Sequence, residues 1–284
     1  MRIGNPFFEA PHRVAHGHPT PAEIEESWRE AKKAFQARWP RKERKLIFII
    51  QEGEQHLDDE AATDVMTELS LVDRRMGIDL VLHTHGGSAV SADRISAMLV
   101  RRKRTASFVP FYAESGGTQI ALSTQMIFFG RGAALTGVEV EAGGWPAHDI
   151  IELARARGDN ASEDLALLAR TAERAVHNEA RRLRRMINFN HKGFLGWRGR
   201  ALSERLAGGH GELIRYRAAK RLGLWVRRGV PSALYEFVGM RREQLRMLRE
   251  LHKQVTLVQH PTRDPSPPPH IARQPEVRPS SASL

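Results

Sequence analysis

The sequence predicts an α/β fold in which a largely parallel sheet is covered by helices. Short, almost fully apolar runs such as LIFII at 46–50 and IDLVLH at 78–83 are typical of strands that are buried on both faces. Between such runs, apolar residues recur at helical spacing, as they do over 58–74. The resulting order over 46–138 is β-α-β-α-β-α-β-β, and strands that alternate with helices indicate a parallel sheet.

The elements of this region can be placed in chain order. The expected elements are strand 46–50, helix 58–74, strand 78–83, helix 89–102, strand 106–113, helix 117–124 and strands 126–129 and 133–138. Before them, residues 1–45 are expected to form an N-terminal extension with one helix over 20–37. Thr20 is its predicted N-cap, Pro21 occupies the first helical position, and Glu23 completes a capping box.

The second half of the chain is predicted to be mainly helical. Helices are expected over 147–157, 162–187, 216–222 and 232–240. The stripe of the long helix, from Leu165 to Ile187, is more typical of a core than of an interface. We therefore assign 46–240 to one domain and 241–259 to a charged helix. Residues 260–284 are rich in proline and serine, which predicts a disordered tail.

Composition excludes several functional classes. The 284 residues contain no cysteine, so disulfides, cysteine-ligated zinc and thiol chemistry are excluded. The start of the chain has no apolar segment typical of a signal peptide, and no stretch is long and apolar enough for a transmembrane helix. We therefore expect a cytoplasmic protein. The 13 histidines form no metal-binding pattern, so neither a metal nor another cofactor is expected.

Most of the net charge of +11 comes from one segment. Residues 181–228 contain fourteen Lys or Arg and two acids, a net charge of +12. Such a segment can attract nucleic acid, an anionic surface or acidic polypeptide, or it can simply be a solvated face. Nucleic acid is not favoured, because zinc-finger, RRM and KH signatures are missing and few aromatic residues are interleaved.

Two glycine-containing turns follow predicted parallel strands. The first is THGG at 84–87 and the second is ESGG at 114–117. The carboxyl ends of neighbouring parallel strands line a common crevice, so the two turns are expected to lie side by side. Ser115 could then be a nucleophile, and Gly86, Gly87 and Gly116 could supply the backbone N–H groups of an oxyanion hole. The alternative is that Ser115 caps a helix, since AESGG lacks the first glycine of a G-x-S-x-G motif.

The two turns and their surroundings resemble a known family. DLVLHTHGGSAVSADRISAMLVRRK, VPFYAESGGTQIALSTQMIFFGRGAALTGVEVE and RLAGGHGELIRYRAAKRLGLWV are similar to segments of the serine dehydrogenase proteinase family. These are Clp-fold serine peptidases related to signal peptide peptidase A and to the ClpP/crotonase superfamily. The resemblance implies a ClpP/crotonase-like core, an ATP-independent peptidase that acts on polypeptide through an acyl-enzyme, and a homo-oligomer.

The resemblance also implies roles for individual residues. Ser115 matches the nucleophile, Gly86, Gly87 and Gly116 match the oxyanion hole, Glu139 stands at the position of an acidic residue, and His210 matches a histidine. His85 replaces a proline of the family pattern, and Thr136 and Gly137 replace a glycine and a proline. These changes put activity in doubt more than fold.

The base that would activate Ser115 is less clearly indicated. Lysine is missing between Ser115 and Lys192, which argues against the Ser/Lys pair of signal peptide peptidase A relatives. We predict His210, oriented by Glu139, with His148 and His85 as alternative bases and His83 as a structural residue. Two other readings stay open: an inactive binding or scaffold protein with this fold, and an acyl-CoA-handling crotonase-type enzyme.

Overall fold

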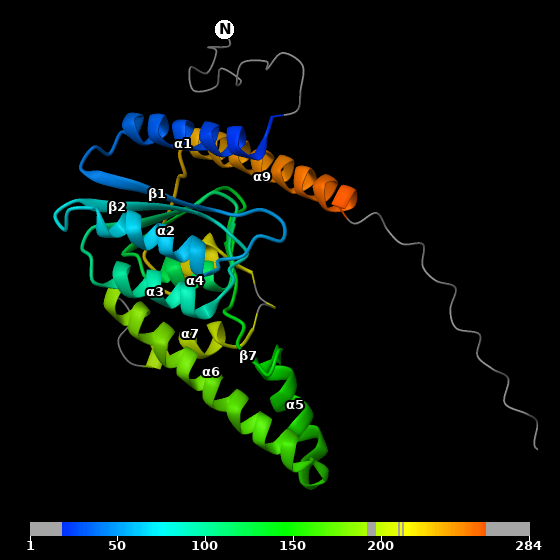
Figure 1. Ribbon diagram of the computed structural model, residues 1–284. Helices are drawn as coiled ribbons and strands as arrows, with labels where there is room; N and C mark the ends of the chain where they lie inside the picture. Colours follow the sequence, from blue (N-terminus) through cyan, green and yellow to red (C-terminus); the bar gives the residue numbers. More distant parts are fainter. Residues whose placement is uncertain (1–18, 192–196, 210, 212, 260–284) are drawn as a thin grey trace, which may run out of the picture.

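The computed structural model describes residues 19–191, 197–209, 211 and 213–259, and its centre is a parallel sheet (Figure 1). The sheet has the order β1-β2-β3-β5-β10, and each neighbouring pair is parallel. Its strands are β1 (Arg44–Ile50), β2 (Gly77–His83), β3 (Thr105–Val109), β5 (Met126–Phe129) and β10 (Val226–Arg228). The predicted α/β class with a parallel sheet is therefore confirmed.

Helices cover both faces of this sheet (Figure 1). The helices are α1 (Pro21–Arg38), α2 (Asp59–Ser70), α3 (Ala89–Val100), α4 (Gly116–Leu122), α5 (Ala147–Arg157), α6 (Glu163–Asn190), α7 (Trp197–Leu206), α8 (Tyr216–Arg221) and α9 (Ser232–Gln259), with a 3-10 turn at Gly158–Asn160. On one face, Phe35 of α1 and Phe237 of α9 pack with Phe48 of β1. On the other, α2, α3, α4 and α6 cover the remaining side chains of the sheet.

The N-terminal helix begins as its sequence predicts. The Thr20 side chain accepts a hydrogen bond from the Glu23 N–H, and the Glu23 carboxylate accepts one from the Thr20 N–H at 2.7 Å. This capping box stabilises the first turn of α1. Glu25 in α1 also pairs with Arg241 of α9 at 2.9 Å, which ties the two outer helices together.

The single strand predicted over 106–113 is wrong, since the chain forms two strands in different sheets. β3 ends at Val109, and β4 (Tyr112–Ala113) leaves the main sheet. Pro110 lies at the break, and proline has no N–H to donate to a continuing ladder. β4 pairs with β6 (Ala134–Leu135), the short remnant of the predicted strand 133–138, and β6 pairs in antiparallel fashion with β9 (Ile214–Arg215).

The C-terminal helical region also differs from the prediction. The helices expected over 232–240 and 241–259 form one helix, α9, so the predicted boundary after residue 240 falls inside it. Helical spacing of buried apolar residues continues from Leu234 through Val238 to Leu245. β10 and α7 were not predicted. The N-terminal residues 1–18 and the predicted tail over 260–284 lie outside the described residues.

A helical hairpin projects from the layered core (Figure 1). It consists of α5 and α6, preceded by the short antiparallel pair β7 (Glu141–Ala142) and β8 (Trp145–Pro146). In the stripe of α6, Ala172, Leu183 and Ile187 are fully buried, which confirms a core role for that part, whereas Leu165, Leu168 and Val176 are only partly buried. Within the described ranges, none of the helices combines the length and hydrophobicity needed to cross a bilayer.

Candidate active site

The two glycine-containing turns are in direct contact. β2 and β3 are neighbours in the sheet, and the turns follow the ends of β2 and β4. Thr84 forms a parallel bridge with Ala113, and the Glu114 N–H donates to the Thr84 carbonyl oxygen at 3.0 Å. A methyl carbon placed on Gly86 would lie 2.9 Å from Ser115 Cβ. The prediction that the turns lie side by side is confirmed.

Ser115 has a strained backbone. Its φ of 48° and ψ of −115° lie where side chains other than glycine are rare, and such strain is common at functional turns. The residue lies at an abrupt strand-to-helix turn, between β4 and α4, and is half-buried. Ser115 is the N-cap residue of α4, but its side chain makes no capping hydrogen bond, so capping does not occupy the hydroxyl. Within the described parts of the chain, its hydroxyl has no hydrogen-bond partner.

Two threonines support this turn. The Thr136 hydroxyl accepts a hydrogen bond from the Ser115 N–H at 3.0 Å and donates one to the Gly137 carbonyl at 2.9 Å. The Thr118 hydroxyl donates to the Ala113 carbonyl at 2.8 Å and accepts from the Thr136 N–H at 3.2 Å. Thr136, which sequence comparison treats as a departure from the family pattern, therefore holds the backbone of Ser115.

The glycines of the first turn have conformations that suit only glycine. Gly86 and Gly87 have φ values of 100° and 146°. The turn is also held by Leu57, whose N–H donates to the Gly86 carbonyl at 2.7 Å and whose carbonyl accepts from the Ser88 N–H at 2.8 Å. The positive φ values and these bonds fix the backbone of the turn beside Ser115.

The N–H groups of the three predicted oxyanion glycines are not equivalent. The Gly86 N–H donates to the Thr84 hydroxyl at 2.9 Å, so this donor is already used. The N–H groups of Gly87 and Gly116 bond to no acceptor among the described residues. A methyl carbon placed on Gly116 would lie 3.8 Å from the Gly87 nitrogen, so these two donors belong to the same small region.

His83 is structural, as expected. It is fully buried, and its ring lies 4.1 Å from the ring of Tyr112, centroid to centroid. Burial, reinforced by the nearby charge of Arg242, lowers the pKa of His83 to about 4. Its Nε2 lies 3.6 Å from the Glu52 carboxylate, too far for a hydrogen bond.

Glu52 connects the site to α9. Its carboxylate accepts hydrogen bonds from Arg242 at 2.5 Å and Arg246 at 3.0 Å. The Arg242 bond is the largest cause that lowers the pKa of Glu52 to about 2. Glu52 lies at the start of the loop that contains Leu57, and Leu57 is hydrogen-bonded to the Gly86 turn. The arginines of α9 therefore contact the loop that supports this turn. Sequence analysis missed this contact because the partners are separated by 190 residues.

The three predicted histidine bases have different surroundings. His85 stacks on Tyr112, and its Nδ1 lies 2.7 Å from the Glu114 carboxylate. His148, in the first turn of α5, has its Nε2 3.3 Å from the Ala207 carbonyl. Neither makes a hydrogen bond to Ser115. His210 lies outside the described residues.

The residues beside position 210 lie near the predicted acidic partner. The Val138 N–H donates to the Leu206 carbonyl at 2.6 Å, which joins the loop after α7 to the segment that contains Thr136. A methyl carbon placed on Gly209 would lie 3.6 Å from Glu139 Oε1. Residues 136–139 therefore connect two parts of the site. Thr136 contacts the Ser115 turn, and Glu139 lies beside Gly209.

Groups of three or more His, Asp or Glu side chains that could hold a metal do not occur in the part of the chain that the structure describes.

A parallel α/β sheet with a serine at a strained strand-to-helix turn, beside a Gly-Gly turn, is the arrangement of a serine hydrolase. The chain belongs to the ClpP-like SDH-type serine proteinase family, whose sequence profile matches residues 47–267. The resemblance deduced from the two turns is therefore confirmed.

Two proteins from an archaeon are similar to this chain at less than 30% identity. The uncharacterized proteins MJ1495 and MJ0137 of Methanocaldococcus jannaschii are 26% and 29% identical over 63% and 66% of this chain. The chain spans 62% and 66% of their lengths, which is less than two thirds.

Solved structures also match. ClpP1 from Listeria monocytogenes aligns with a TM-score of 0.42 at 14% identity, over 65% of this chain and 92% of that one. A mutant of the 1510-N membrane-bound stomatin-specific protease aligns with a TM-score of 0.45 at 15% identity, over 68% of this chain and 82% of that one.

Proposed function

We propose that the chain is an ATP-independent serine peptidase in which Ser115 forms an acyl-enzyme with a polypeptide substrate. The observation that carries the proposal is the strained Ser115 turn beside two backbone N–H groups, those of Gly87 and Gly116, that bond to no described acceptor. Membership of a serine proteinase family supports the reaction class.

The reaction would proceed in two steps. The Ser115 hydroxyl oxygen attacks the peptide carbonyl carbon while its proton passes to the base, and the Gly87 and Gly116 N–H groups bind the resulting oxyanion. The C–N bond then breaks, the amine takes the proton from the base, and an ester on Ser115 remains. In the second step a water molecule attacks the ester carbonyl carbon while its proton passes to the base. The ester bond then breaks, the serine oxygen takes the proton from the base, and the carboxylic acid is released.

We propose His210 as the base and Glu139 as the residue that orients it. The proposal is supported by Gly209, which lies beside Glu139, and by the contact between the loop after α7 and the Thr136 segment. His85 and His148 are alternatives, but each already has a described partner other than Ser115.

A second candidate is a binding protein that keeps the fold without turnover. It is favoured by one observation, namely that the Ser115 hydroxyl is bonded to no histidine or lysine of the described residues. This reading predicts that Ser115 reacts with acylating reagents no faster than an ordinary serine.

A fluorophosphonate probe tests these proposals. Wild-type protein should be labelled, Ser115→Ala should not, and His210→Ala should lose labelling while His148→Ala and His85→Ala retain it. If labelling is retained in His210→Ala and lost in His148→Ala or His85→Ala, the histidine replaced in the unlabelled variant is the base. No labelling of the folded wild-type protein from neutral to alkaline pH would instead favour the binding protein.

A further inference from the structure

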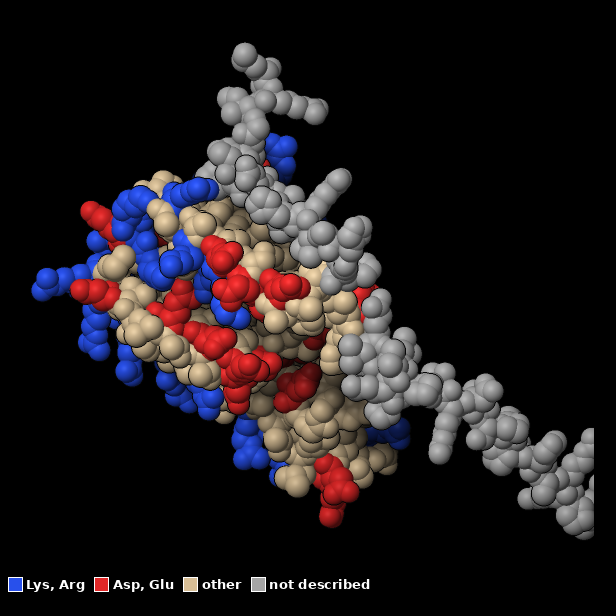
Figure 2. Space-filling view, turned by 45° about the horizontal axis from the view of Figure 1, so that its top comes forward, with Lys and Arg blue, Asp and Glu red and all other residues tan. Residues whose placement is uncertain are grey.

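Charge is distributed unevenly over the molecule. On the face in Figure 2, acidic side chains gather in a band across the middle, while Lys and Arg side chains lie mainly to one side and along the lower rim. The arginines of the basic segment 181–228 lie in more than one place. Arg181, Arg184 and Arg200 lie around a hollow on α6, and this hollow is also lined by the acidic residues Glu173 and Glu204. A group of arginines farther along the chain has different surroundings.

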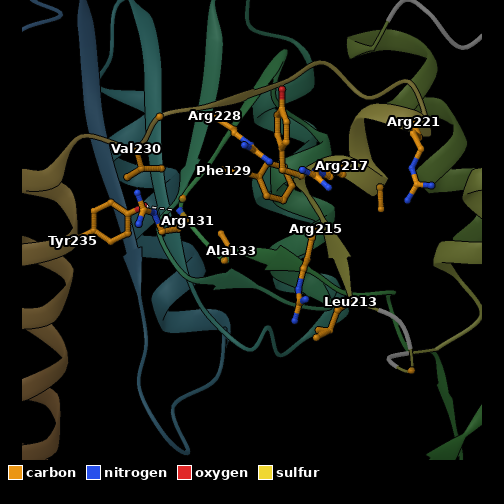
Figure 3. A pocket seen from close by; sticks show the side chains of 16 residues that line it. Phe129, Arg131, Ala133, Leu213, Arg215, Arg217, Arg221, Arg228, Val230 and Tyr235 are labelled. Carbon is orange, nitrogen blue, oxygen red and sulfur yellow. Dashed lines mark hydrogen bonds between the residues drawn. The ribbon is translucent and has the colours of Figure 1, made fainter.

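Five arginines surround a second and larger hollow, of about 1390 Å³. Figure 3 shows these side chains coming from three separate stretches of the chain. They are Arg131, which follows β5, Arg215, Arg217 and Arg221 of β9 and α8, and Arg228 of β10. We call this feature the arginine hollow. The residues lining it include no aspartate or glutamate, among those that the structure describes.

The five guanidinium groups have no carboxylate partners in the described part of the molecule. None of the five arginines takes part in an ion pair among the described residues. All five are exposed to solvent. Other arginines of the fold differ, since Arg44 pairs with the buried Asp79 and Arg242 with Glu52. Like charges held close together repel, so a concentration of unpaired arginines is unfavourable until an anion binds. The arginine hollow therefore has the charge of an anion-binding site.

The arginine hollow is connected to the proposed nucleophile by a short sheet. Arg215 of β9 pairs with Ala134 of β6, and Thr136, which follows β6, holds the Ser115 N–H. Ala133 lines the hollow and is separated from Thr136 by three residue steps, or roughly 10 Å of extended chain. The arginine hollow and the Ser115 turn are therefore supported by the same short sheet, and an extended polypeptide is the kind of ligand that could contact both.

The surroundings favour acidic polypeptide over nucleic acid. Arginine recognises both carboxylates and phosphates, but single-stranded nucleic acid also needs free aromatic faces on which bases stack. The Tyr216 ring is covered by the Arg228 guanidinium at 4.7 Å and meets the edge of Phe129. The Tyr235 hydroxyl is held by the Arg131 N–H at 2.9 Å. The face of the Tyr216 ring is thus already covered, and the Tyr235 ring packs edge-on with Phe111.

We propose that the arginine hollow binds an aspartate- or glutamate-rich segment of the polypeptide substrate, a few residues from the bond that is cleaved. This inference rests on the proposed peptidase function, because that function makes a polypeptide the ligand of the neighbouring turn. Exposed ion pairs are individually weak, so several arginines act together and the binding weakens as salt increases.

The test is a binding measurement on the full chain carrying Ser115→Ala, which cannot turn over a substrate. A fluorescent peptide rich in glutamate and a matched peptide with glutamine in its place are compared by anisotropy at low and at physiological salt. We expect the glutamate peptide to bind about tenfold more tightly at low salt, with a smaller difference as salt increases. Equal affinities for the two peptides would overturn the proposal.

A matched pair of charge variants locates the binding. Arg217→Gln/Arg221→Gln in the arginine hollow should weaken binding of the glutamate peptide about fivefold. Arg181→Gln/Arg184→Gln removes the same charge from the hollow on α6 and should change it less than twofold. Thermal unfolding checks that both variants are folded. Equal weakening by the two variants would show that only net charge matters and would overturn the proposal.

Two further outcomes separate the alternatives. A single-stranded oligonucleotide that displaces the glutamate peptide at lower concentrations than unlabelled peptide does would assign the hollow to nucleic acid and overturn the proposal. Because binding is measured without turnover, its result is independent of the fluorophosphonate experiment. Glutamate-specific binding without labelling of wild-type Ser115 would leave an acidic-peptide site and reject the peptidase function. Labelling of Ser115 without glutamate-specific binding would support the peptidase function and reject the acidic-peptide site.

Discussion

Replacing Thr136 by valine tests how the Ser115 turn is held. Valine has nearly the shape of threonine but has no hydroxyl to accept the hydrogen bond from the Ser115 N–H. Thr136 is only 4% exposed, so water cannot readily replace the lost acceptor. The strained φ of Ser115 then loses one of the contacts that maintain it.

Valine also loses the bond to the Gly137 carbonyl, but the size of the effect on Ser115 is worked from the bond that the Ser115 N–H itself loses. Leaving a buried donor without a partner costs about 1–3 kcal/mol. If this cost falls on the reactive conformation of the turn, Ser115 should react roughly 5- to 150-fold more slowly, since about 1.4 kcal/mol corresponds to a factor of ten. Thr136→Ser keeps the hydroxyl and is the matched control.

The assay is the rate of fluorophosphonate labelling, measured at a temperature at which unfolding curves show all three proteins to be folded. A merely structural role would lower stability and leave the rate per folded molecule unchanged. The expected result is slow labelling of Thr136→Val and nearly normal labelling of Thr136→Ser. A folded valine variant that is labelled as fast as the wild type would refute the role of Thr136.

Three further predictions concern the surroundings of the turn. Gly86→Ala would bring a methyl group to 2.8 Å from the Glu114 carbonyl and should reduce labelling by about tenfold or more, whereas Gly132→Ala, also at positive φ but in open space, should leave it unchanged. Glu52→Gln should lower the free energy of unfolding at neutral pH by about 1–3 kcal/mol in urea titrations, because it weakens the charged hydrogen bonds to Arg242 and Arg246 on α9, which lower the pKa of Glu52 and are partly screened by solvent; an unchanged unfolding midpoint would contradict this. His83 and His191 have pKa values lowered to about 4 by burial, so the unfolded chain binds more protons than the folded one between about pH 6.5 and pH 4. Stability should fall by about 2 kcal/mol for each histidine from pH 7 to pH 5, and a His83→Phe variant should show a shallower fall than the wild type.

The main features of the fold could be predicted because they depend on local patterns. The runs at 46–50 and 78–83 are short and almost fully apolar, which indicates strands that are buried on both faces, and both form strands of the main sheet whose side chains are largely buried. The capping residues of α1 act within four positions of one another and were predicted correctly. By contrast, β10 contains two arginines and pairs with a strand about a hundred residues earlier, so its pattern carries no strand signal.

The site was predicted where it depends on two adjacent strands. Parallel neighbours bring their carboxyl ends together, which placed the Gly86 turn beside Ser115. The role of Thr136 and the use of the Gly86 N–H by Thr84 could not be predicted, because hydrogen bonds depend on the exact path of each turn. The departure of Thr136 from the family pattern indicated a weaker site, whereas the structure gives this side chain a supporting bond.

The central claim is that Ser115 becomes acylated, and mapping of the acyl group tests it most directly. The protein is incubated with an activated ester, quenched in acid and digested, and the peptides are analysed by mass spectrometry. The account predicts one acyl group per chain, carried on the Ser115 hydroxyl, which disappears on longer incubation as water hydrolyses it and is missing from Ser115→Ala. A folded protein that carries no acyl group at Ser115, or that is acylated equally well when Ser115 is alanine, would contradict the account.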